Sequence, residues 1–187
     1  MKHQANREFY AYWDGKRAGA AAPERSDLEP DQVRHLLGDI FVLSCDALAG
    51  YPFRVAGTRM CALLGADLKG QSFTSLFRDA DRDEMADLLG IVAEETQATV
   101  VGITALAPDS TRIHLELLLL PFSARSHSPV SMTGLLAPLS PIEGPQTYGN
   151  LKDFSVTSWR HLEQDRGPRA LRKWSLIRGL TVYEGLR

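Results

Sequence analysis

The feature that most constrains the fold is a strongly apolar stretch at residues 112–120, RIHLELLLL. Every second residue along it is aliphatic, which places one continuous apolar face on a β-strand: Ile113, Leu115, Leu117 and Leu119. On the opposite face, His114 and Glu116 are polar. Further along that face, Leu118 and Leu120 are apolar again. The sequence therefore predicts a strand that is partly covered on both faces.

The other patterns place this strand in an α+β domain. Apolar spacing and turn residues predict helices at 4–18, from Pro30, at 58–65 and from Asp79 to about 97, and strands at 40–46, 51–56, 98–107 and 129–139. Strands on both sides of a block of helices favour an antiparallel sheet with helices on one face. We expect an N-terminal helix and arm at 1–22, a domain at 23–142, and a linker with a basic and aromatic C-terminal extension at 143–187.

Three local packing predictions follow from the spacing. The helix that begins at Pro30 should bury the stripe Val33, Leu36 and Leu37. The helix near 79–97 should start at a cap formed by Asp79 or Asp81 and bury the stripe Met85, Leu88, Leu89 and Val92. In the strand at 51–56, Phe53 and Val55 should share one face and Arg54 should point the other way.

Composition narrows the class of protein. Of the 187 residues, 44% are hydrophobic and the net charge is -2, which suits a globular chain and disfavours a nucleic-acid binder that is basic throughout. Two cysteines, Cys45 and Cys61, are too few for a disulfide framework and suit a reducing compartment. No apolar run reaches the roughly 18 residues that a membrane helix needs, and the N-terminus lacks a signal peptide's apolar region. We expect a cytoplasmic protein with no membrane segment.

Several separate blocks, in the same order, resemble a PAS-domain family common in alphaproteobacteria, whose members are often short single-domain proteins. The resemblance covers residues 8–140. It rests on a helix with a tryptophan, a proline-containing segment, and later Gly-Thr and Gly-x-x-Leu-x-Gly segments, at Trp13, Pro23, Arg25, Leu28, Pro30, Phe53, Gly57, Thr58, Gly65, Leu68 and Gly70. The resemblance implies a PAS-like five-stranded antiparallel sheet with helices on one face, and a sensing or interaction role.

The helices between the second and third strands would form the far wall of a pocket. Its apolar lining would be Phe41, Leu43, Phe53, Val55, Met60, Leu64, Phe73, Met85, Leu88, Val92, Val101, Ile103 and Leu117. Two methionines beside aromatic rings would make such a pocket adaptable. The alternative is a filled core, because apolar stripes at helical or strand spacing form core more often than they line ligand sites.

Three polar residues are candidates for the rim of this pocket: Arg54, Thr58 and Arg59. The two arginines could pair with an anionic ligand or a partner's carboxylate. The alternative is a structural ion pair with Asp67 or Asp46. Thr58 could instead cap the helix that follows it.

Other chemistry finds little support. The histidines form no HxxxH or HExxH pattern and no CxxC pair occurs, so we expect no metal site. The helix at 79–97 lacks a histidine for haem, and His114 would approach the interior only if its face were inverted. Cys61 lies in RMCALLG, which does not match the flavin-binding segment of PAS-like light sensors; we expect a small core residue. Without GxSxG, GxGxxG or Walker patterns, we predict neither a catalytic site nor a nucleotide site, and no cofactor is assigned.

The N-terminal helix places three aromatic residues on one face, Phe9, Tyr12 and Trp13. They could fold back onto the outer face of the sheet, where Leu118 and Leu120 lie, or pack on a second subunit. We expect a homodimer that uses this helix and the exposed sheet.

The C-terminal segment 151–187 holds eight basic and four acidic residues, a net charge of +4, together with Trp159 and Trp174. It could dock on the domain as a helix or strand with its arginines solvated, or contact nucleic acid. The leading hypothesis is a non-enzymatic PAS-type sensory or regulatory protein of bacterial signalling, which acts by binding a small molecule, a partner protein, or both. The alternative is a nucleic-acid-associated regulator that uses this basic tail.

Overall fold

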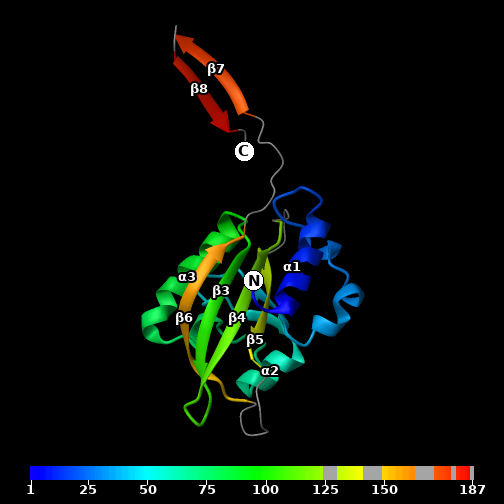
Figure 1. The fold of residues 1–187 in the computed structure, drawn as a ribbon, viewed down its shortest axis with the longest axis vertical. Helices are drawn as coiled ribbons and strands as arrows, with labels where there is room; N and C mark the ends of the chain where they lie inside the picture. Colours follow the sequence, from blue (N-terminus) through cyan, green and yellow to red (C-terminus); the bar gives the residue numbers. More distant parts are fainter. Residues whose placement is uncertain (124–129, 141–148, 163–170, 178–179, 186–187) are drawn as a thin grey trace.

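An antiparallel sheet forms the centre of the fold (Figure 1). The computed structural model describes residues 1–123, 130–140 and 149–162 in full, and only the backbone of 171–177 and 180–185. Six strands pair in the order β2-β1-β5-β4-β3-β6. Their bounds are β1 Ile40–Ser44, β2 Phe53–Ala56, β3 Thr99–Leu106, β4 Arg112–Pro121, β5 Ser131–Pro138 and β6 Lys152–His161.

Helices cover both faces of this sheet. The inner face carries α2 (Thr58–Leu64), the 3-10 helix η3 (Thr74–Leu76) and α3 (Asp79–Glu94). The outer face carries α1 (Gln4–Arg17), and the 3-10 helices η1 (Arg25–Asp27) and η2 (Pro30–Leu36) follow it in the chain. Figure 1 shows α1 lying across β4 and β5. The predicted α+β class with an antiparallel sheet is confirmed.

The prediction that β4 is covered on both faces is also confirmed. Leu117 and Leu119 belong to the apolar cluster between the sheet and α3. Leu118 and Leu120 belong to a second cluster, beneath α1. The strand thus separates two cores, which explains why its sequence lacks the polar and apolar alternation of a half-exposed strand.

The sheet has one strand more than the five expected. The additional strand, β6, comes from the segment assigned to the C-terminal extension, and it pairs antiparallel with β3. Phe154 anchors β6 in the inner core, where it is 1% exposed and its ring packs against Phe77. The sequence does not predict this strand, because most residues of β6 are exposed and polar and therefore lack the apolar alternation of a half-buried strand. Its pairing partner lies about fifty residues earlier in the chain.

Val55 lies on the opposite face from the one predicted and is 51% exposed. The β1–β2 hairpin is present, but its register shifts between Val42 and Leu43. Val42 pairs with Val55 and Leu43 pairs with Phe53, so Arg54 is an extra residue on β2. Such a bulge inverts the alternation of faces beyond it. Phe53 therefore points into the core and Val55 points away.

The helices differ from the predictions at their ends. Leu37 is 39% exposed, whereas Val33 and Leu36 are buried. The segment is a 3-10 helix, in which residues three apart share a face, so Leu37 falls outside the stripe. The N-cap position of α3 is Arg78, without a side-chain cap, rather than an aspartate.

The buried stripe predicted for α3 is confirmed at Met85, Leu88, Leu89 and Val92. In the described part of the chain, no helix has both the length and the apolar character needed to cross a membrane. Towards the C-terminus, β7 (Leu171–Ile177) and β8 (Leu180–Gly185) pair antiparallel as a separate two-stranded sheet.

Candidate functional site

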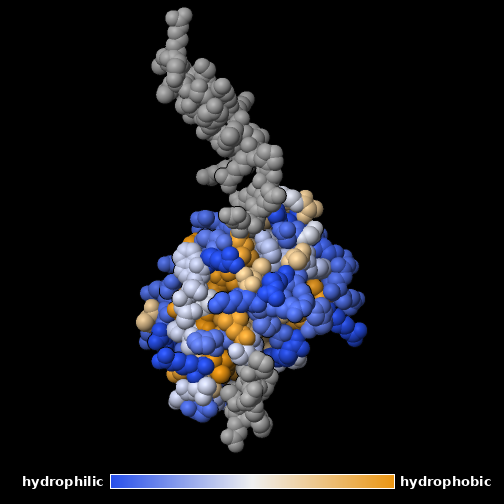
Figure 2. Space-filling view, in the orientation of Figure 1, coloured by the Kyte–Doolittle hydropathy of each residue, from blue (hydrophilic) through white to orange (hydrophobic). Residues whose placement is uncertain are grey.

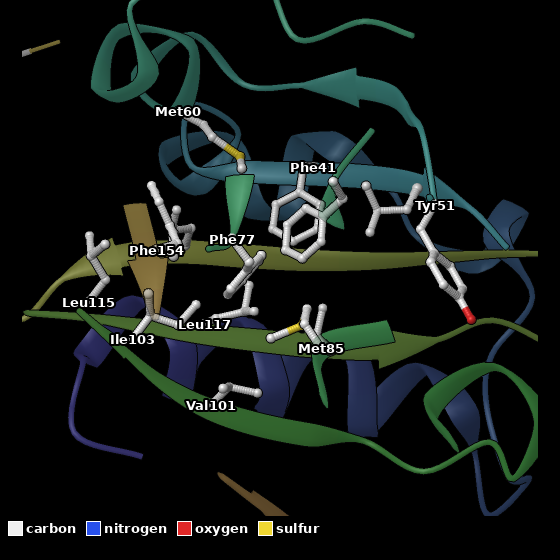
Figure 3. Packing of buried hydrophobic residues seen from close by; sticks show 14 of the residues in the cluster. Phe41, Tyr51, Met60, Phe77, Met85, Val101, Ile103, Leu115, Leu117 and Phe154 are labelled. Carbon is white, nitrogen blue, oxygen red and sulfur yellow. The ribbon is translucent and has the colours of Figure 1, made fainter. Parts of the chain in front are cut away.

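The interior between the sheet and the helices is filled with aromatic side chains. Neighbouring rings have centroids 5.5 to 5.8 Å apart, which is contact distance, in a cluster of Phe41, Phe53, Phe73, Phe77 and Phe154. Figure 3 shows Met60, Met85 and several β3 and β4 side chains around these rings. Each ring is at most 2% exposed. These rings pack against one another in the place where the sequence predicts a pocket or, as the alternative, a core.

The predicted lining residues do meet around this interior, apart from Val55. The members that are buried there are Phe41, Leu43, Phe53, Met60, Leu64, Phe73, Met85, Leu88, Val92, Val101, Ile103 and Leu117. They pack against one another as one cluster. A ligand would enter this space only by displacing side chains of the cluster.

The predicted rim residues do not act as a group. The Arg59 Nε donates to Asp39 Oδ1 over 2.8 Å, and its Nη2 donates to the main-chain oxygen of His35 over 2.8 Å. The expected ion pair thus exists, but its partner is Asp39 rather than Asp67 or Asp46. Thr58 is the first residue of α2 and does not cap it, because the N-cap position is Gly57.

Arg54 is exposed on the edge strand β2 and forms no ion pair with another described residue. It is the extra residue of the bulge described above. This position keeps it away from the interior, where a rim residue would lie.

The outer face of the sheet holds α1 in place. Phe9 and Trp13 are 1% and 0% exposed and share a cluster with Leu118 and Leu120. The helix therefore folds back on its own sheet, one of the two arrangements left open by the sequence. In this arrangement these four residues lie inside the chain and cannot meet a partner directly. Tyr12 packs at the margin of the same cluster.

Glu116 attaches the start of α1 to β4. Its carboxylate accepts hydrogen bonds from the main-chain N–H groups of Lys2, over 2.6 Å, and His3, over 2.9 Å. The buried Asn6 side chain donates to the same carboxylate over 3.1 Å. Burial raises the pKa of Glu116, but these three donors outweigh it and hold the pKa below its usual value. A charged Glu116 therefore stabilises the attachment.

Beside this attachment, a cavity of about 540 Å³ opens on the outer face over β3, β4 and β6. Its lining is Met1, Lys2, Val100, Gly102, Ile103, His114, Leu115, Glu116, Leu139, Ser140, Thr157, Ser158, Trp159 and Arg160. Its volume falls within the range of pockets that bind small molecules or partner side chains. Figure 2 shows apolar surface exposed on this face of the molecule.

Gly102 lines the cavity. A Cβ at this position would lie 2.8 Å from Ser158 Oγ and 2.9 Å from Thr157 Oγ1, so the hydroxyl groups of β6 approach the bare backbone of β3. Lys2 and Arg160 supply positive charge at the rim, and neither forms an ion pair with another described residue. The cavity therefore combines apolar walls with positive charge.

His114 belongs to this outer surface and not to the interior. Its Nδ1 lies 3.0 Å from Thr104 Oγ1, and it lines both the large cavity and a neighbouring one of about 350 Å³. The face assigned to it from the sequence is therefore right. The described residues include no group of three or more His, Cys, Asp or Glu side chains placed to hold a metal ion.

The two cysteines are structural in character. Cys61 lies on α2 and packs against the inner core, as expected. Cys45 packs against the same core, and burial raises the pKa of its thiol to about 11. A thiol with so high a pKa is a poor nucleophile near neutral pH.

The sequence did not identify the attachment of α1 or the cavity next to it. In the sequence pattern, Glu116 is a polar residue of an apolar strand, and nothing in the pattern distinguishes Asn6. A single acidic residue in an otherwise aliphatic strand was the available signal, since a buried carboxylate needs hydrogen-bond donors. The cavity could not be predicted because β6 forms part of its wall, and the pairing of β6 with β3 appears only in the tertiary structure.

The fold is an α+β domain: an antiparallel sheet with helices packed against both its inner and its outer face. Residues 1–137 match the family model described as a PAS domain. The chain belongs to this family, which supports a sensory or regulatory role. A comparison with curated proteins finds no match.

The chain is also similar in fold to solved structures. The Rhodobacter sphaeroides LOV protein is 17% identical with a TM-score of 0.43, over 59% of this chain and 67% of that one. The PAS domain of an HTR-like protein from Haloarcula marismortui is 18% identical with a TM-score of 0.42, over 72% of this chain and 99% of that one. An RNA-binding Light-Oxygen-Voltage receptor is 16% identical with a TM-score of 0.47, over 62% of this chain and 34% of that one.

Proposed function

We propose that this PAS domain is a non-enzymatic regulatory module that works by protein contact on the outer face of its sheet, with a second copy of the chain as the partner. The observation that carries the proposal is the contrast between the two faces. The inner face is filled by aromatic rings, whereas the outer face presents a cavity with apolar walls beside α1. In a symmetric dimer, each copy would bury this apolar-walled surface against the other.

The cavity offers a route for regulation because it shares residues with the attachment of α1. Glu116 and Lys2 line the cavity and also hold the start of the helix. A change that loosens this attachment would alter the wall of the contact surface. The signal would then be a shift between two populations of the dimer contact.

The test is the oligomeric state of the full chain, measured by size exclusion with light scattering over a range of concentrations. We expect a dimer. Ser158→Arg places a long charged side chain over Gly102 and should raise the dimer dissociation constant by about tenfold or more, which is about 1.4 kcal/mol. Leu48→Arg adds the same charge at a fully exposed loop position and should leave the dimer unchanged. A monomer at every concentration would refute the proposal.

A small-molecule ligand remains a prediction from the sequence, and native mass spectrometry separates it from protein contact alone. A dimer that carries extra mass points to a bound molecule, and a bare dimer points to contact between proteins. Nucleic-acid contact through the basic tail also remains a prediction. Salt-dependent retention on heparin is its direct test.

A further inference from the structure

Contacts with other described residues close the outer edge of β6 along its first half but not along its second half. β6 is the last strand on its side of the sheet. The Phe154 carbonyl oxygen accepts a hydrogen bond from the Arg78 N–H over 3.0 Å. The Val156 N–H donates to Asp81 Oδ1 over 3.0 Å. The chain at the start of α3 therefore satisfies this half of the edge.

Among the described residues, no comparable contact covers the second half. Leu162 donates its N–H to the Ala98 oxygen over 2.8 Å, which fixes the side that faces β3. Because residues alternate along an antiparallel ladder, the main-chain groups of Trp159 and His161 turn away from β3. No hydrogen bond joins these two N–H groups to another described residue. The Trp159 side chain is also 45% exposed, so this half of the edge presents unpaired polar groups beside an exposed aromatic ring.

The C-terminal hairpin is a two-stranded sheet without a third strand among the described residues. β7 and β8 pair with each other, from Leu171 opposite Gly185 to Ile177 opposite Leu180. An isolated two-stranded hairpin is at best marginally stable in water and needs a third strand or another packed surface. Nine residues, 162–170, connect β6 to β7, and a chain of that length spans up to about 30–32 Å. β7 can therefore reach the open half of the edge.

Charge also favours contact between the hairpin and the edge of β6. Residues 163–187 contain six basic and three acidic residues, a net charge of +3. The helix beside the edge, α3, contains six acidic residues and one basic residue. Its exposed Glu84 accepts a hydrogen bond from Trp159 Nε1 over 3.1 Å, which places a carboxylate directly beside the edge. A basic hairpin on β6 would lie against this acidic helix.

We propose that the hairpin β7–β8 docks on the open half of β6 in the same chain, with β7 antiparallel to β6, and extends the sheet beyond its six strands. Docking satisfies the main-chain groups of Trp159 and His161 and gives the hairpin its third strand. It also protects an exposed edge that would otherwise pair with other chains. The C-terminal segment thereby becomes a structural part of the PAS body, next to the proposed contact surface.

Hydrogen exchange of individual amides in the full chain tests this proposal. The Trp159 and His161 amides should be protected, as the Val156 amide is by Asp81. Ser175→Pro removes a ladder donor from the middle of β7 and should speed exchange at Trp159 and His161 by about tenfold or more. The Val156 amide should not change, and it reports whether the body of the variant remains folded. Exchange at free-chain rates at Trp159 and His161 in the unmodified chain overturns the proposal without any variant.

Concentration identifies the source of the hairpin. Protection that is independent of protein concentration supports docking within one chain. Protection that disappears on dilution, together with the dimer, shows a hairpin supplied by a second copy and overturns the arrangement proposed here. Ser158→Arg should weaken the dimer but leave these amides protected, so the two proposals can fail separately.

Discussion

The indole Nε1 of Trp13 donates a hydrogen bond to the main-chain oxygen of Pro121 over 3.0 Å, inside the outer core. This bond joins the last turns of α1 to the end of β4. Glu116, which lies earlier in the same strand, holds the start of the same helix. The two contacts fix α1 on the sheet at both ends, so each can be tested by substitution.

Trp13→Phe keeps an aromatic ring but leaves the Pro121 oxygen without its donor. A buried acceptor without a partner costs about 1–3 kcal/mol, so the free energy of unfolding should fall by that amount in urea titrations. Lys16→Gln, on the same helix, removes an ion pair with Glu29 and a cation–π contact with the Tyr12 ring, both near the surface, and should lower the midpoint less. Equal midpoints for Trp13→Phe and the unmodified chain would show that the bond does not hold the helix.

Glu116→Gln should weaken the attachment of α1, because a neutral amide has one acceptor oxygen where the carboxylate offers two. We expect a loss of about 1–3 kcal/mol at pH 7. The pKa of Glu116 is lower in the folded chain, so its contribution is present above its unfolded pKa of about 4.3 and lost as the pH falls through the folded value.

The measurement for Glu116 is the urea midpoint at pH 7 and at pH 3. The difference between these two midpoints should be smaller in Glu116→Gln than in the unmodified chain. Glu94→Gln removes an exposed carboxylate of α3 and serves as the control. The same pH dependence in all three proteins would contradict a role for the Glu116 charge.

Phe154→Ala should lower the free energy of unfolding by about 3–5 kcal/mol, since it removes a fully buried ring from the aromatic cluster. Phe154→Leu should cost less, because it refills part of the cavity. The measurement is denaturant unfolding followed by fluorescence in a Trp159→Phe, Trp174→Phe background, where the remaining tryptophan is the buried Trp13 on the other face of the sheet. If only local signals near β6 changed, β6 would not be part of the cooperative unit.

Gly57→Ala and Gly15→Ala should have opposite effects. A Cβ at Gly57 would lie 2.2 Å from the main-chain oxygen of Leu37, so the backbone must move, at a cost of about 1–3 kcal/mol. A Cβ at Gly15, within α1, meets nothing within 4 Å and should stabilise the helix by about 0.5–1 kcal/mol. Melting temperatures of the two variants provide the comparison, and a shift in the same direction would contradict this account.

Cys45 should react slowly with iodoacetamide at pH 8. Burial raises the pKa of its thiol to about 11, so the reactive thiolate is rarer than in a free thiol by roughly a hundredfold. Mass spectrometry of timed samples measures the rate, and the protein unfolded in urea supplies the reference. A rate in the folded protein equal to that reference would show that the thiol is accessible and ordinary.

The sequence by itself determined the local elements and their apolar faces. Residues 4–18 and the stripe from Met85 to Val92 were predicted as helical faces, and both are observed. The two apolar faces of 112–120 required two cores, because every second side chain of a strand lies on the same face. These properties depend on spacing along the chain, which the sequence states directly.

Only the tertiary structure decided which distant segments meet. The pairing of β6 with β3, the shift in register that turns Val55 outwards, and the choice of Asp39 as the partner of Arg59 each depend on contacts between separate parts of the chain. The packing of the inner face is also a property of the tertiary structure. Five phenylalanine rings from β1, β2, β6 and the segment before α3 meet there, because close packing depends on how side chains fit in space and not on their order in the sequence.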